Sequence, residues 1–109
     1  MDCMQVVTTT DSREEADRLA RSAVEGRLAA CAQVAGPVTS TYWWEGAVQT
    51  ATEWQCVLKT TAGRFDELRS HLERQHSYET PEIVATPIVA GGAAYLDWIR
   101  RETDGAQQH

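Results

Sequence analysis

The sequence predicts one α+β domain over residues 1–109, with elements in the order βαββαβ and a further helix at the C-terminal end. Runs rich in β-branched residues alternate with segments whose apolar residues recur at helical spacing. Two prolines, Pro37 and Pro87, fall inside the predicted second and fourth strands. These are the edge strands of a βαββαβ sheet, where a residue without a backbone N–H is tolerated.

The first strand and helix have clear boundaries in the sequence. Residues 4–9 are predicted to form a strand, and Ser12 and Glu15 follow at the spacing of a capping box. An apolar stripe then repeats every three or four positions, formed by Ala16, Leu19, Ala20, Ala23 and Val24. Gly26 predicts the end of this helix.

A long hairpin comes next. Residues 28–44 are rich in Ala, Val, Thr and aromatic residues and are interrupted by Gly36–Pro37. Glu45–Gly46 marks the turn into Val48 and the run 53–61, the predicted third strand.

The second half of the chain repeats the pattern of helix and strand. Helical spacing of Phe65, Leu68 and Leu72 predicts a second helix that runs to His76. Residues 78–81 are predicted to form a loop, residues 82–89 a strand, and the segment after Gly91–Gly92 a short helix. Right-handed crossovers then give a ferredoxin-like, four-stranded antiparallel sheet with both main helices on one face. We expect an ordered core over about residues 4–102 and a loose tail over residues 103–109.

Composition excludes several classes of partner. Ten Lys and Arg against sixteen Asp and Glu give a net charge of −6, which disfavours nucleic acid. The apolar runs fall far short of the ~20 residues that span a membrane. The first residues do not resemble a secretory signal, so we expect a cytoplasmic protein. Three cysteines without a C-x-x-C pair indicate reduced thiols.

Several segments resemble the CutA family of divalent-cation tolerance proteins: residues 28–31 (LAAC), 40–46 (STYWWEG), 58–60 (LKT), 76–82 (HSYETPE) and 95–98 (YLDW). Taken together they cover the chain from about Met4 to Arg101. Ser77 stands where the family usually has a proline. The resemblance implies a ferredoxin-like protomer, a homotrimer similar in architecture to the PII signalling proteins, and weak binding of copper or other divalent metals.

Aromatic residues at the end of the hairpin indicate association independently of the resemblance. Strand alternation must turn some of Tyr42, Trp43 and Trp44 away from the protomer's own core, where a neighbouring subunit would cover them. The alternative is that they pack under the terminal helix of the same chain.

Candidate metal ligands are Cys31, His76 and Glu79, a set that suits copper or zinc better than calcium or magnesium. Each of the first two residues has an alternative role. Cys31 suits a small buried apolar position. His76 suits the C-terminus of a helix, where it complements the helix dipole.

A second candidate site is polar. Glu53 and Lys59 lie on one face of the third strand by alternation. With Tyr78, Glu79 and Glu82, and with Trp44 of a neighbouring hairpin, they resemble the family's polar positions around a cleft between subunits. Lys59 would contact a small anion there and Tyr78 would donate a hydrogen bond. The alternative is a structural network of ion pairs.

No motif for nucleotide binding or serine hydrolysis is present, and the third strand lacks the basic and aromatic signature of RNA-recognition domains. We therefore predict no enzymatic reaction. The main hypothesis is a CutA-like trimer that binds divalent metal. The alternative hypothesis is a PII-like signalling or scaffold trimer that binds a small anion or a protein.

Overall fold

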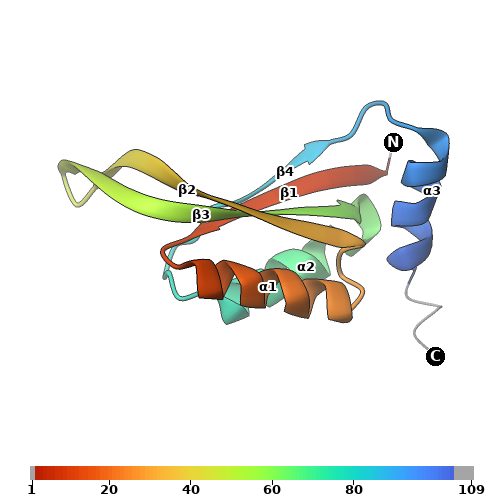
Figure 1. Cartoon of the computed structure of the whole chain (residues 1–109), viewed down its shortest axis with the longest axis horizontal. Coiled ribbons are helices and arrows are strands. Elements are labelled where there is room, and N and C mark those ends of the chain that lie inside the picture. The colour runs from red at the N-terminus through yellow and green to blue at the C-terminus, as the bar shows by residue number, and fades with distance from the viewer. Residues whose placement is uncertain (1, 105–109) are drawn as a thin grey trace.

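A computed structural model describes residues 2–104 of the chain and confirms the predicted fold (Figure 1). Its elements are β1 (Cys3–Thr10), α1 (Arg13–Glu25), β2 (Cys31–Trp44), β3 (Ala47–Thr61), α2 (Ala62–Gln75), β4 (Ile83–Pro87) and α3 (Ala93–Glu102). The strands form one sheet in the order β2-β3-β1-β4, and every neighbouring pair is antiparallel. β2 and β4, which contain Pro37 and Pro87, are the edge strands, as predicted.

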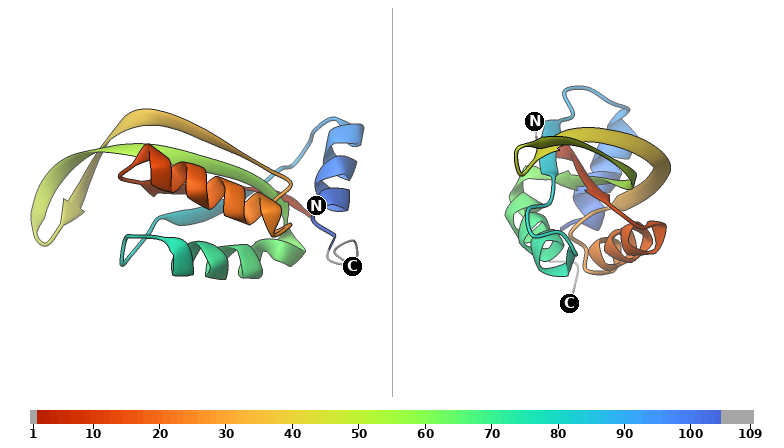
Figure 2. Two further views of the ribbon diagram at one scale, coloured as in Figure 1. Left: turned by 60° about the horizontal axis from the view of Figure 1, so that its bottom comes forward. Right: turned by 90° about the vertical axis from the view of Figure 1, so that its left-hand side faces the viewer.

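The main core lies between the sheet and the two long helices. α1 and α2 cover the same face of the sheet (Figure 2). Val6, Cys56 and Leu58 point from the central strands into this layer, and they meet Leu19 of α1 and Leu68 of α2. Such burial stabilises a protein by about 1.5–3 kcal/mol for each large apolar side chain. On the opposite face of the sheet, the side chain of Val84 on β4 is 50% exposed.

The β2–β3 hairpin is the longest feature and arches away from the helices (Figure 2). Its register is continuous except between Ala35 and Val38, where Gly36 and Pro37 form an irregularity. Gly36 has φ +150, and a Cβ there would approach Trp54 Cδ1 to 2.8 Å. Only glycine fits at this bend, because a larger residue would be strained and would clash.

Several element boundaries differ from the prediction by one to three residues. β2 begins at Cys31 rather than Leu28, because the N–H groups of Leu28 and Ala29 donate to the carbonyl of Ala23 and close α1. β4 is also shorter than predicted, ending at Pro87. α2 begins at Ala62, earlier than the first apolar residue of its stripe.

The predicted tail needs a correction at Thr103. This residue is 2% exposed, and its hydroxyl donates to the Ile99 carbonyl at 2.8 Å, so it is part of the folded end of α3. Residues 105–109 lie outside the described part of the chain, and their looseness stays a prediction. Within residues 2–104, each helix is too short or too polar to cross a membrane.

Candidate functional site

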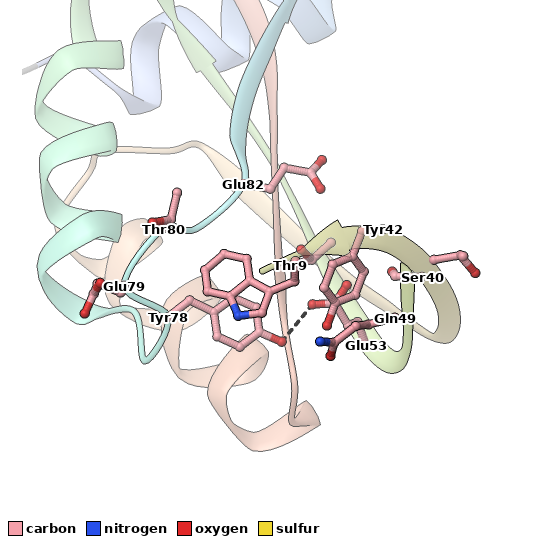
Figure 3. Close-up of a pocket in the computed structure, with 11 residues that line it drawn as sticks. Thr9, Ser40, Tyr42, Gln49, Glu53, Tyr78, Glu79, Thr80 and Glu82 are labelled. Atoms are coloured by element: carbon pink, nitrogen blue, oxygen red, sulfur yellow. Dashed lines mark hydrogen bonds between the residues drawn. The ribbon is translucent and has the colours of Figure 1, made fainter. Parts of the chain in front are cut away.

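A pocket of about 620 Å³ lies between the hairpin and the loop that joins α2 to β4 (Figure 3). β1 adds one residue at its floor. The lining side chains are polar or aromatic: Thr9, Ser40, Thr41, Tyr42, Trp44, Gln49, Glu53, Tyr78, Glu79, Thr80 and Glu82. None of them is Lys or Arg, so the charge of the pocket is negative.

A hydrogen bond between Tyr78 and Glu53 joins the two sides of the pocket. The Tyr78 hydroxyl donates to Glu53 Oε2 at 2.7 Å, and Glu53 is only 8% exposed (Figure 3). Burial raises the pKa of the Tyr78 phenol well above its usual value, and the hydrogen bond to Glu53 and its negative charge raise it further. Tyr78 is therefore a fixed proton donor in the physiological pH range.

His76 fixes the loop that carries Tyr78. Its fully buried side chain places Nε2 2.9 Å from the Thr9 carbonyl oxygen, and Nδ1 accepts from the Tyr78 backbone N–H at 3.0 Å. Since a carbonyl cannot donate, Nε2 carries the proton and Nδ1 is the acceptor. Both ring nitrogens thus have protein partners.

Glu15 of α1 is a functional residue that the sequence prediction missed. Its carboxylate accepts the Ser77 N–H at 2.8 Å and the Ser77 hydroxyl at 2.7 Å, and it lies 3.6 Å from His76 Nδ1. The Ser12 half of the predicted capping box is confirmed, because Ser12 Oγ accepts from the Glu15 N–H at 3.1 Å. The Glu15 side chain, however, holds the loop. A proline at position 77 could not donate the backbone hydrogen bond.

The three predicted metal ligands do not meet within one protomer. Cys31 is opposite Lys59 in the β2–β3 register, whereas His76 contacts Thr9, which is opposite Gln55. Four residues of strand, roughly 13 Å, separate these two levels. Across residues 2–104, no three His, Cys, Asp or Glu side chains are close enough together to hold a metal ion.

The predicted polar cleft is assembled in part. Trp44, Glu53, Tyr78 and Glu82 line the pocket together with Glu79, all from one chain. A contribution from the Trp44 of a neighbouring subunit stays a prediction. Lys59 does not line it. It lies six residues from Glu53 along β3, roughly 20 Å away, because a strand rises about 3.3 Å per residue. Lys59 is therefore not part of this pocket within one protomer, and its contact with an anion in a cleft between subunits stays a prediction.

The hairpin aromatics are not packed under the terminal helix. Tyr42, Trp43 and Trp44 are 41%, 74% and 49% exposed. α3 lies at the opposite end of the molecule from the hairpin turn (Figure 1). The alternative that these residues are covered by their own chain is therefore wrong.

Comparison with known proteins tests the resemblance to the CutA family. A family model described as CutA1 divalent ion tolerance protein matches residues 4–102. The chain is 43% identical to the divalent-cation tolerance protein CutA of Archaeoglobus fulgidus over 94 residues, which are 86% of this chain and 91% of that protein. It is 39% identical over 98 residues to the chloroplastic CutA 1 of Oryza sativa subsp. japonica, covering 90% of this chain and 55% of that longer protein.

Solved structures agree with the sequence comparison. The crystal structure of CutA from Xylella fastidiosa superposes with a TM-score of 0.93 at 33% identity, covering 95% of this chain and all of that one. A structure described as the periplasmic CutA of Archaeoglobus fulgidus gives a TM-score of 0.90 at 39% identity, covering 94% and 99%. Since the match extends over nearly every element of the fold, the chain belongs to the CutA1 family of divalent ion tolerance proteins.

Proposed function

We propose that this protein is a non-catalytic homotrimer that acts in tolerance of divalent cations and binds copper or a similar metal weakly. The observation that carries the proposal is the large apolar surface that one protomer leaves uncovered. Trp43 and Val48 of the hairpin are 74% and 57% exposed, and Val84 on the open sheet face is 50% exposed. Trp43 and Val48 are opposite each other in the hairpin register, and an exposed apolar pair of this kind is typical of an interface.

Association also suits the shape of the hairpin. β2 is an edge strand whose outer hydrogen-bonding groups have no neighbouring strand, and β2 and β3 extend together beyond the helices (Figure 2). Copies that cover each other's hairpins would bury the aromatic residues. Closed symmetry is the usual solution for such an assembly.

Metal ligands are then drawn from more than one protomer. Cys31 is half-exposed, with its thiol 3.5 Å from the Tyr95 hydroxyl, and it is the soft donor that remains accessible. Glu79 is exposed and offers a carboxylate. His76 is a weaker candidate, because ligation would cost it one of two hydrogen bonds.

Light scattering combined with a copper titration tests the proposal. We expect a trimeric mass at micromolar concentration and saturable binding of one copper per protomer or per trimer. Cys31→Ser should abolish copper binding and keep the mass, while Glu14→Gln, a change on the exposed side of α1, should alter neither. A monomeric mass, or copper binding that persists in Cys31→Ser, contradicts the corresponding part of the proposal.

Cytoplasmic location is also part of the proposal. Its support is that Cys3, Cys31 and Cys56 are all free thiols, as is usual in a reducing compartment. The rice relative is named chloroplastic and the archaeal one periplasmic, so relatives occupy different compartments. Cell fractionation followed by immunodetection decides the point, and a purely membrane-bound or secreted pool would contradict it.

A further inference from the structure

We propose that the seam between α1 and α2 binds a small, doubly charged oxyanion of the phosphate class, held by Arg18, His71 and Arg74. Five polar residues form this seam: Arg18, Ser22, His71, Arg74 and Gln75. It lies on the helix side of the sheet, whereas the hairpin arches away from the helices (Figure 2). The association proposed above uses the hairpin and the open sheet face, so it leaves the seam accessible.

Polar contacts join the two helices at two successive turns. Ser22 Oγ of α1 lies 2.8 Å from His71 Nε2 of α2. One turn away, the Arg18 guanidinium donates to the backbone and side-chain oxygens of Gln75, each at 3.4 Å. Good hydrogen bonds from N–H to oxygen measure about 2.7–3.2 Å, so these donors of Arg18 are weakly engaged. A stronger acceptor in the seam would compete for them.

Arg18 and Arg74 lack a carboxylate partner within residues 2–104, unlike most arginines of the protein. The arginines that do form ion pairs are Arg21, Arg27, Arg64, Arg69, Arg100 and Arg101. Arg74 donates instead to the Ser70 hydroxyl at 2.7 Å. Both unpaired side chains belong to exposed residues on facing helices. Because a guanidinium presents several donors in one plane, such a pair suits the oxygens of a phosphate or sulfate group.

His71 supplies a third donor beside the two arginines. It lies one helical turn from both Arg74 and Gln75, and its Nδ1 has no partner among residues 2–104. Burial and the positive charge of Arg74 lower the pKa of this imidazole below its ordinary value. A bound dianion would act in the opposite direction, because negative charge favours the protonated ring. Anion binding should therefore be coupled to uptake of a proton, after which Nδ1 donates to the anion.

The charges around the seam restrict the ligand to a small ion. Glu25 and Glu67 lie one turn beyond the Ser22–His71 contact, and they are paired with Arg21 and Arg64 at 3.1 and 2.9 Å. Glu14 is exposed one turn before Arg18. These acids, with the net charge of −6, would repel an extended polyanion such as nucleic acid. A single phosphate-sized group can contact the arginines and His71 without reaching the flanking carboxylates.

The test follows the ring resonances of His71 by NMR while the full chain is titrated with sulfate, which stays doubly charged at neutral and mildly acidic pH. Chloride at equal ionic strength is the control. We expect saturable shifts at millimolar sulfate, a raised pKa of His71, and tighter binding as the pH falls through that pKa. Equal shifts in chloride, or a pKa of His71 that sulfate leaves unchanged, overturn the proposal.

Two variants and a matched control assign the site. Arg18→Gln and Arg74→Gln each remove one charge at an exposed position, and each should weaken sulfate binding about fivefold. Arg13→Gln changes the net charge equally and should bind like the parent. Arg13 is exposed and nine residues from Ser22, which places it on the opposite side of α1. Affinity that is unchanged in both seam variants, or lowered equally in Arg13→Gln, overturns the assignment.

Two further probes distinguish a free ion from a phosphorylated molecule. Binding of both inorganic phosphate and glycerol phosphate assigns the seam to a phosphate group that a larger molecule can carry, and binding of inorganic phosphate alone assigns it to the free ion. Binding of neither overturns the proposal. Copper binding and the mass in solution should be unchanged in Arg74→Gln, because the seam is separate from Cys31 and from the hairpin.

Discussion

At the hairpin end of the protomer, acidic and aromatic side chains surround a pocket whose loop is held by buried hydrogen bonds. At the other end, where α3 packs, Cys31 lies beside Tyr95, and the Tyr95 ring stacks on Trp98 with centroids 5.6 Å apart. The hydrogen bond with Cys31 and burial raise the pKa of the Tyr95 phenol. One end therefore carries negative charge and aromatic rings, and the other offers a soft, accessible sulfur.

This difference separates residues that the sequence prediction grouped together. Cys31 and His76 were expected to share a metal, and Glu53 and Lys59 were expected to share a cleft. In each pair one residue belongs to each end of the molecule, because β3 runs the whole length of the sheet and separates positions that share a face. If the two ends behave independently, a substitution at one end should leave the properties of the other end unchanged.

The largest effect is expected at Glu15. Glu15→Ala removes the acceptor of the Ser77 N–H and hydroxyl, which should lower the free energy of unfolding by about 2–3 kcal/mol and loosen the Tyr78 loop. Chemical denaturation measures the change. Glu14→Ala, at the exposed neighbouring position, is the control and should change stability by less than about 0.5 kcal/mol. Equal effects of the two substitutions would show that Glu15 does not hold the loop.

Tyr78→Phe should lower the free energy of unfolding by about 1–2 kcal/mol, because the Glu53 carboxylate loses its donor while it stays buried. The substitution should also change the response to alkaline pH. The unfolded phenol ionises near its ordinary value of about 10, while the folded one keeps its proton, so its contribution to stability is complete below pH 10 and falls as the pH rises. Parent and variant should therefore converge in stability above pH 10. A constant difference from pH 8 to 11 would contradict this.

Trp44→Ala should weaken association of the protomers by about 1–2 kcal/mol, as is usual for a partly buried aromatic at an interface. Sedimentation on serial dilution measures it. Trp98, on α3 at the opposite end, provides the comparison, and Trp98→Phe should leave association unchanged. An unchanged sedimentation profile of Trp44→Ala would remove this residue from the proposed interface.

The smallest effect is expected at Lys59, which forms no ion pair among the described residues. Lys59→Met should therefore change the free energy of unfolding of the protomer by less than about 0.5 kcal/mol. Chemical denaturation at protein concentrations that favour the protomer measures this change in stability. A loss of several kcal/mol would place Lys59 in a buried ion-pair network, as one reading of the sequence suggested.

Local patterns predicted the fold well because each depends on neighbours in the chain. The Ser12 cap, the apolar stripe of α1, the Glu45–Gly46 turn and the alternation along β3 all involve residues a few positions apart. The pocket could be predicted only in part. Tyr78, Glu79 and Glu82 are close in sequence, but nothing local shows that Glu15 reaches Ser77 across 62 positions.

The sequence by itself determined the order of the elements and the edge strands, because propensity, periodicity and turn chemistry act over short distances. The resemblance of its segments to the CutA family indicated the family that the comparisons then showed. The tertiary structure alone decided which of the candidate residues meet. Charge complementarity depends on positions in space, and a strand of 15 residues carries two side chains of one face far beyond the reach of a hydrogen bond.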